Sequence, residues 1–208
     1  MLRSLNTVLG STIHAKDGEL GHVHDGLFDD RAWAIRYLVV ETGSWLSSRR
    51  VLLAPSVAGR PDWDKRVLPV ELTMDQVRHS PDVDIAKPVS RQQEIAMSQH
   101  YGWLSYWAAE PPFFPQPVLE PAAPIPEEGD PHLRSVKEVC AYDVKATDGD
   151  LGRVNDMIME DANWVIRFMA VSTGSWFSGQ KLLLPTRLVG SISWSHRHVL
   201  LAQSRDEL

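Results

Sequence analysis

The stretch Asp17-Gly-Glu-Leu-Gly-His-Val-His-Asp25 decides the fold, because it returns 131 residues later as Asp148-Gly-Asp-Leu-Gly-Arg-Val-Asn-Asp156. Around it, residues 2–77 align without a gap on residues 133–208, with 27 identical residues in 76 positions. A repeat of this length is large enough to be a small domain rather than one unit of a solenoid. The sequence therefore predicts two related domains in one chain.

Each repeat shows the pattern of short strands joined by tight turns. Asp17-Gly18 and Asp148-Gly149 are hairpin signals, because Gly accepts a positive φ and Asp stabilises the turn. The run Trp33-Ala-Ile-Arg-Tyr-Leu-Val-Val40 and its counterpart, residues 164–171, are rich in aromatic and β-branched residues, which favours strand over helix. Roughly five or six short strands in about 70 residues predict a mainly β chain with two small, strongly bent barrels.

Three segments are expected along the chain. Residues 1–80 form the first barrel (the first repeat), residues 81–132 form a linker, and residues 133–208 form the second barrel (the second repeat). The linker holds 10 of the 14 prolines, so most of it cannot be regular helix or sheet. A capping-box pattern predicts a short helix over residues 92–100 that ends at Gly102.

Charge and composition limit the classes of function. Of the net charge of −6, most belongs to residues 78–132, which carry 3 basic and 8 acidic residues, so neither repeat has the basic excess typical of nucleic-acid binding. Cys140 is the single cysteine, which excludes an intrachain disulfide and a Cys-rich zinc site. No signal peptide or membrane span is visible in the sequence. These features predict a cytoplasmic protein.

The repeated motifs resemble those of the PRC-barrel family. They are the D-G-x-L-G-x-V-x-D pattern that begins at Asp17 and Asp148, the W-x-I-R strand at Trp33 and Trp164, and a closing leucine-rich strand in each repeat. Relatives in that family include the cytoplasmic domain of the photosynthetic reaction-centre H subunit and the C-terminal domain of the ribosome maturation factor. The resemblance covers both repeats and implies two PRC-type barrels in tandem, joined by a Pro-rich linker with a short helix.

The resemblance implies an adaptor that docks onto proteins. We therefore expect a non-enzymatic protein-interaction module with an unidentified protein partner, without a cofactor, present as an intramolecular pseudo-dimer or a homo-oligomer. One alternative is an RNA-associated or ribosome-associated barrel protein. Others are a photosynthesis-related protein similar to the reaction-centre H subunit, or a sensor of a small ligand or metal. The H-subunit relatives carry a transmembrane helix ahead of the barrel, and this chain shows none, which argues against a direct role in a reaction centre.

Two arginines inside apolar strands are candidates for structural ion pairs. Arg36 and Arg167 occupy equivalent positions in the two repeats, and Asp25 and Asp156 recur as well. Because a buried guanidinium is normally paired with a carboxylate, we expect Arg36 to pair with Asp25, and Arg167 with Asp156. Contact with a ligand or partner is the alternative.

Aromatic residues supply the candidate interface residues. Trp45 and Leu46, and their counterparts Trp176 and Phe177, follow a Gly turn and can form either a lid on the core or a docking surface. The linker adds the four aromatics Tyr101, Trp103, Tyr106 and Trp107. We expect this aromatic segment to pack across both barrels, and a binding surface for a separate protein is the alternative. The remaining Pro-rich tether of about 20 residues is long enough to place the second domain almost anywhere.

Metal-binding and nucleophilic residues are sparse. His22 with His24, and His196 with His198, place two imidazoles on one face of a strand, but neither pair recurs in the other repeat and neither has an identifiable third ligand. Cys140 replaces Leu9 of the first repeat, which favours a packed side chain over a nucleophile. The sequence thus predicts neither catalytic nor metal-binding residues.

Overall fold

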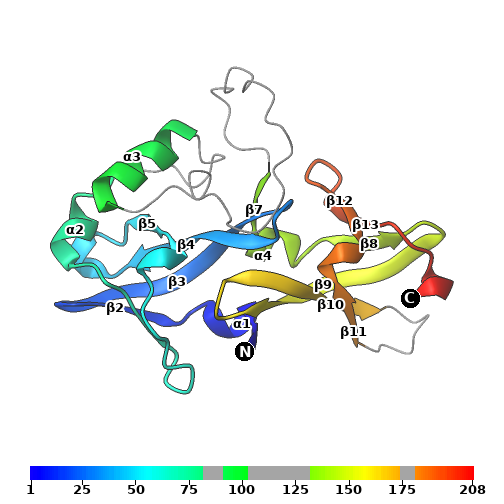
Figure 1. The fold of residues 1–208 in the computed structure, drawn as a ribbon, viewed down its shortest axis with the longest axis horizontal. Coiled ribbons are helices and arrows are strands. Elements are labelled where there is room, and N and C mark those ends of the chain that lie inside the picture. Colours follow the sequence, from blue (N-terminus) through cyan, green and yellow to red (C-terminus); the bar gives the residue numbers. More distant parts are fainter. Residues whose placement is uncertain (82–90, 103–131, 174–180) are drawn as a thin grey trace, which may run out of the picture.

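The computed structural model describes residues 1–81, 91–102, 132–173 and 181–208, and these residues are mainly β (Figure 1). Thirteen strands in this part of the chain belong to a single sheet. The sheet is not closed on itself. The mainly β fold expected from the sequence is therefore confirmed, whereas the two barrels stay a prediction.

The two repeats contribute matching elements in the same order. The first contains β1 (Leu2–Ser4), α1 (Leu5–Val8), β2 (Thr12–Ala15), β3 (Gly18–Asp29), β4 (Ala34–Thr42), η1 (Ser44–Leu46), β5 (Arg50–Leu53), η2 (Pro55–Val57), β6 (Val67–Pro69) and α2 (Met74–Arg78). The second contains β7 (Leu133–Ser135), α4 (Val136–Val139), β8 (Asp143–Ala146), β9 (Gly149–Glu160), β10 (Val165–Thr173), β11 (Lys181–Pro185), η4 (Thr186–Leu188), β12 (Val189–Ser193), β13 (His198–Leu201) and η5 (Arg205–Glu207).

The repeated motif forms a hairpin and a close crossing of strands. Its Asp-Gly pairs lie at the turns between β2 and β3 and between β8 and β9, where the aspartate is the last residue of the turn and the glycine is the first residue of the following strand. Its second glycines, Gly21 and Gly152, have φ of +140° and +153°. A Cβ atom would lie 2.1 Å from the Glu41 carbonyl oxygen at the first position and 2.2 Å from the Ser172 carbonyl oxygen at the second. Only glycine allows this approach between neighbouring strands, which explains its recurrence.

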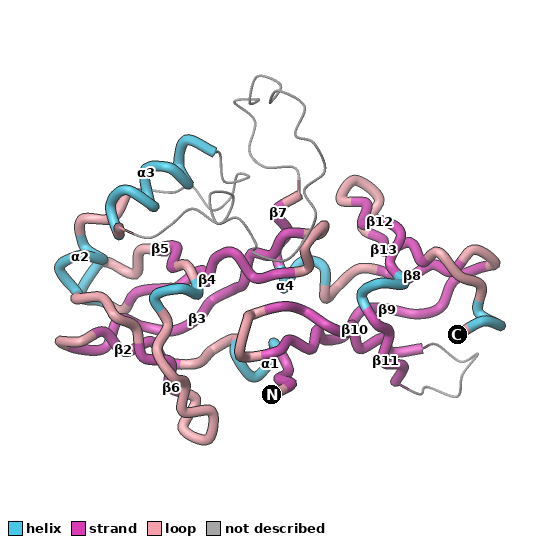
Figure 2. Tube along the Cα trace, viewed as in Figure 1, coloured by secondary structure: helices cyan, strands magenta, loops and turns pink. Residues whose placement is uncertain are grey.

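The repeats exchange their first strands. β1 pairs with β9 of the second repeat, and β7 pairs with β3 of the first repeat (Figure 2). At the centre, β4 and β10 meet at the equivalent residues Ala34 and Val165. The Ile35 amide donates to the Trp164 carbonyl at 2.9 Å, and the Ile166 amide donates to the Trp33 carbonyl at 2.6 Å. The contacts between the two repeats are therefore reciprocal.

One apolar cluster spans both repeats. Equivalent side chains supply it, as the sequence predicts, and Ile35 and Ile166 are both buried, at 4% and 0% exposure. The equivalent pairs in it include Leu5 and Val136, Leu20 and Leu151, Val23 and Val154, Leu38 and Met169, and Leu53 and Leu184. The two repeats therefore share one core.

The helices follow their sequence signals. Thr73 and Gln76 form the capping box that begins α2. The linker helix α3 (Arg91–Tyr101) is followed by Gly102 with φ of +69°, so the helix predicted there is confirmed. None of the helices in the described ranges is both long and apolar enough to cross a membrane.

Candidate protein-docking surfaces

Asp25 and Asp156 hold the exchanged segments in place. The Asp25 carboxylate accepts hydrogen bonds from the Ser135 hydroxyl at 2.5 Å, the Lys137 amide at 3.1 Å and the Gly26 amide at 2.7 Å. Ser135 and Lys137 belong to the second repeat, at the start of α4. The buried carboxylate of one repeat thus satisfies the N-terminal donors of a short helix of the other.

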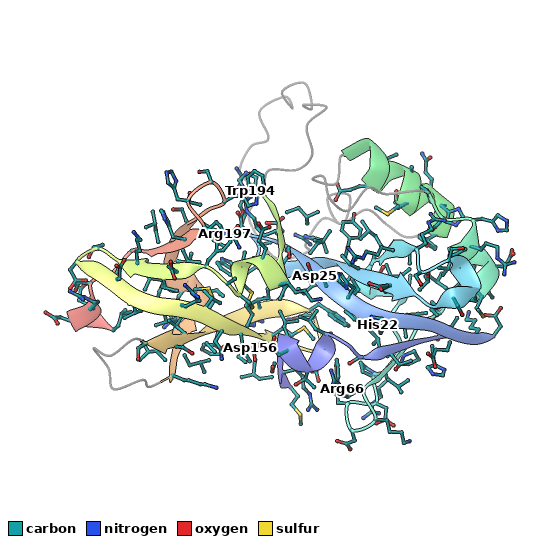
Figure 3. The ribbon with its side chains drawn as sticks, turned by 180° about the vertical axis from the view of Figure 1, so that it is seen from behind. His22, Asp25, Arg66, Asp156, Trp194 and Arg197 are labelled. Atoms are coloured by element: carbon teal, nitrogen blue, oxygen red, sulfur yellow. The ribbon has the colours of Figure 1, made fainter. Side chains whose placement is uncertain are left out.

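Asp156 repeats this arrangement in the opposite direction. It accepts from the Ser4 hydroxyl at 2.5 Å, the Asn6 amide at 3.2 Å and the Met157 amide at 2.7 Å. Figure 3 shows both aspartates near the middle of the molecule, where the repeats meet. The expected ion pairs of these aspartates with Arg36 and Arg167 are wrong, because their carboxylates are used by the exchanged segments.

The two arginines pair with a different equivalent pair of acids. The Arg36 Nη2 atom lies 3.3 Å from Asp29 Oδ2, and the Arg167 Nη2 atom lies 2.6 Å from Glu160 Oε2. The expected pairing within each repeat is thus observed with another partner. Burial differs from the expectation for Arg167, whose side chain is 47% exposed against 19% for Arg36.

The ionisation of both acids reflects these contacts. Burial by itself would raise the pKa of Asp29, but the amides of Ala32 and Arg31 and the Arg36 guanidinium together hold that pKa below its usual value. Hydrogen bonds from Arg167 and Asn163 lower the pKa of Glu160. Both carboxylates are therefore charged near neutral pH.

Methionine in place of these arginines should have unequal effects. We expect Arg36→Met to lower the free energy of unfolding by about 1–3 kcal/mol, because it leaves a shielded carboxylate without its cation. Arg167→Met should cost less than about 1 kcal/mol, since exposed ion pairs contribute little. Urea denaturation of both variants measures the difference, and equal losses would contradict it.

A groove of about 760 Å³ runs between the repeats, lined by β1, β4, the segment after β5 and the turn between β9 and β10. Arg3, Arg36 and Arg60 line it, and Asp161 is the acid among its lining residues. Arg3 Nε lies 3.5 Å from Asp161 Oδ2, and the Arg3 guanidinium lies 5.5 Å from the ring centre of Trp63. The groove can therefore hold an anionic group. Sequence reasoning missed it, because strand exchange brings its lining residues together.

The outer face of the first repeat lies under α3. Five apolar side chains meet there, and all are at most 8% exposed: Leu27, Tyr37, Val39, Leu52 and Met97. The Tyr37 hydroxyl donates to the buried Glu94 carboxylate at 3.0 Å. This face is therefore closed within the molecule.

The equivalent face of the second repeat is more open. Ile158, Phe168 and Ala170 are half-buried there, and Leu183 is 52% exposed, whereas its counterpart Leu52 is 2% exposed. Figure 1 shows α3 beside β4 and β5, whereas in the part of the chain that is described only the short η4 lies beside β10 and β11, with no counterpart of α3. Sequence reasoning missed this face, because the two leucines are identical in the aligned repeats.

The tip between β12 and β13 presents a second exposed group. Trp194 is 61% exposed, and its indole N–H donates to Glu138 at 3.0 Å. The Arg197 guanidinium lies 5.6 Å from the ring centre of Tyr142. Both labelled side chains lie close together in Figure 3. Tryptophan and arginine together are typical of protein contact sites.

The predicted interface residues divide into two groups. The Trp45 indole donates to the Leu20 carbonyl at 2.9 Å and packs on the core, with Leu46 half-buried beside it, which favours the lid over the docking surface. Tyr101 packs against the apolar clusters of the shared core and the first repeat. The others lie outside the described residues: Trp103, Tyr106, Trp107, Trp176 and Phe177.

The histidine pairs engage neighbouring polar groups. The His24 Nδ1 atom lies 3.2 Å from Glu41 Oε2, and burial lowers the pKa of His24, so this imidazole is mostly neutral at pH 7. His196 stacks on His198 with ring centres 5.4 Å apart. No three histidine, cysteine, aspartate or glutamate side chains of the described ranges are grouped so that they could hold a metal ion.

Cys140 is shielded from reaction. Burial raises the pKa of its thiol to about 12, and the carboxylates of Asp156 and Asp25 add to this shift. Because the thiolate is the reactive form, alkylation by iodoacetamide at pH 8 should be on the order of 100-fold slower in the folded chain than in urea. A mass-spectrometric time course measures both rates at this single cysteine, and similar rates would contradict the expectation.

Neither a family model nor a curated protein matches this chain. The candidate surfaces are therefore distinguished by their own contacts. The face over β10 and β11 is distinctive, because its counterpart in the same molecule is covered. An apolar side chain exposed at a position that is buried in the other repeat points to a partner.

Proposed function

We propose that this chain is a non-enzymatic protein-docking module made of two PRC-type barrels in tandem. The repeated D-G-x-L-G-x-V-x-D and W-x-I-R motifs support the family assignment, and the matching element order of the repeats agrees with it. The half-buried Cys140 fits a reducing, cytoplasmic compartment. In this proposal the first repeat and α3 form a closed scaffold, and the second repeat presents the binding face.

One observation carries the proposal. Leu183 is 52% exposed at a position where the first repeat buries Leu52 almost completely. Burial of one leucine side chain contributes about 1.5–3 kcal/mol, so leaving it in water costs stability unless a partner covers it. Some residues that recur in both repeats could in principle take part in chemistry, but they already stabilise the fold. They are Arg36 with Arg167, and Asp25 with Asp156.

Partner capture tests the docking function. Immobilised wild-type chain and Leu183→Glu are compared in a native lysate, with Leu200→Glu, 37% exposed on β13, as the matched control. We expect a stoichiometric protein to be retained by wild type and by the control and lost by Leu183→Glu, with the same circular dichroism for all three. Identical retention by all three variants would reject this face as the docking site.

A second candidate function, binding of a small anionic ligand, is favoured by the exposed guanidinium group of Arg60 in the groove, beside those of Arg3 and Arg36, which pair with Asp161 and Asp29. A thermal-shift screen with dicarboxylates and phosphorylated metabolites tests it, because a ligand that binds the folded state raises the melting temperature. Arg60→Glu should abolish such a shift, since Arg60 is exposed in the groove. No shift with any anion at millimolar concentration would reject this candidate.

A further inference from the structure

The packing of α3 on the outer face of the first repeat shows which kind of segment binds to such a face. Its inward residues Glu94, Met97 and Ser98 are at most 8% exposed, and Tyr101 continues the same stripe. Their spacing of i, i+3, i+4 and i+7 is one face of an α-helix, whereas Ile95, at 39% exposure, points away. The first repeat thus receives one face of a helix, on which the apolar bodies of Met97 and Tyr101 alternate with the polar Glu94 and Ser98.

The second repeat offers the same receiving surface in the same register. Val39 pairs with Leu52 between β4 and β5, and Ala170 pairs with Leu183 between β10 and β11. Phe168 replaces Tyr37, so the hydroxyl that donates to Glu94 has no counterpart. A helix on the second face would therefore carry an apolar residue where α3 has a carboxylate.

The rim of this second face is positively charged. In the first repeat Arg50 lies 3.4 Å from Glu41. The equivalent residues are Lys181 and Ser172. Serine stands where the first repeat has Glu41, so Lys181 has no carboxylate at that position, and its side chain is exposed. Arg187 is exposed at the other end of β11, and neither cation has an ion pair within the described ranges. Such a rim favours acidic residues in a bound segment.

We infer that the face formed by Ile158, Phe168, Ala170 and Leu183 docks an amphipathic helix of a partner protein. The helix has apolar residues at i, i+3 and i+7, a small residue at i+4, as Ser98 is in α3, and acidic residues beside that stripe. This inference depends on the proposed docking function and adds its occupant. Docking of an amphipathic helix in an apolar groove is a recurrent mode of peptide recognition.

A synthetic helix derived from α3 tests the occupant. The peptide spans residues 91–102 with Glu94→Leu, Ile95→Glu and Gln99→Glu, between alanine-rich turns that maintain its helicity. Fluorescence anisotropy of the labelled peptide with the full chain should show saturable binding. Leu183→Glu should weaken it by roughly tenfold or more, since one buried anchor can dominate such a contact. Lys181→Glu should weaken it less, and Leu200→Glu not at all.

The outcomes separate the occupant from the docking function. Absence of binding to wild type, or equal binding to Leu183→Glu, overturns the helix. If Leu183→Glu nevertheless loses its captured protein from the lysate, the docking function stands with a different occupant. Light scattering measures the oligomeric state of wild type and Leu183→Glu. If wild type is a dimer and Leu183→Glu is a monomer, a second copy of the chain covers this face. That result also overturns the partner helix.

Discussion

Alanine in place of Asp25 should lower the free energy of unfolding by about 3–5 kcal/mol, because a charged acceptor with several hydrogen bonds is lost from a buried site. The Asp25 carboxylate accepts three hydrogen bonds, two of them from the other repeat. Its removal leaves the Ser135 hydroxyl and the Lys137 amide without an acceptor at the start of α4. Asp156→Ala should cost somewhat less, since Asp156 is half-buried where Asp25 is buried.

Urea denaturation of the full chain measures both losses. Asp64→Ala is the matched control, because Asp64 is exposed and its replacement should change stability by less than about 0.5 kcal/mol. The double variant Ser135→Ala with Asp25→Ala should lose less than the sum of the single variants, since both remove the same hydrogen bond. A loss below about 1 kcal/mol for Asp25→Ala would show that the carboxylate does not hold the exchanged segment.

Local sequence signals predicted the elements but not the exchange. The Asp-Gly turns, the apolar run at Trp33 and the capping box at Thr73 all act over a few residues, and the structure has each of them. Exchange involves contacts between residues far apart in the sequence, such as that of Ser135 with Asp25, which are 110 residues apart. In a duplicated chain, each repeat can make the same contacts within itself or with its copy, so the pattern is identical for both.

The same ambiguity misdirected the prediction for the ion pairs. Arg36 and Asp25 both recur, and Arg36 lies inside an apolar run, so the sequence alone favoured their pairing. In the structure the carboxylate of Asp25 is occupied by donors from β7 and α4, two elements that the sequence analysis did not predict. Arg36 pairs instead with Asp29, seven residues earlier on the neighbouring strand.

The candidate docking face could not be found from one sequence for a related reason. Leu52 and Leu183 are identical residues in identical patterns, and only the packing of α3 against the first repeat distinguishes their exposure. The linker helix itself was predicted, but nothing in its sequence specifies which repeat it covers. Trp45 was predicted either as a lid or as a docking residue, and its hydrogen bond to the Leu20 carbonyl and its packing on the core favour the lid.

A chain cut between its repeats should stay in one piece in solution. The exchanged strands β1 and β7, the contact of β4 with β10 and the shared apolar core all connect the halves without the linker. Ion pairs also cross between them, among them Arg3 with Asp161 and Arg134 with Asp30. A protease site placed between Ala122 and Ala123 gives the cut, and the halves should co-elute at the mass of the intact chain.

Denaturant should then separate the halves only as they unfold, because their interface is the core of each half. A two-domain protein with closed, independent barrels behaves differently: its halves part on dilution, and each keeps its circular dichroism spectrum. Charge reversal at these two ion pairs, Arg3→Glu with Arg134→Glu, should make the cut form dissociate at a lower urea concentration. The uncut chain should be affected less, because its linker keeps the halves at high effective concentration. Folded monomeric halves after cleavage at micromolar concentration would contradict the shared core.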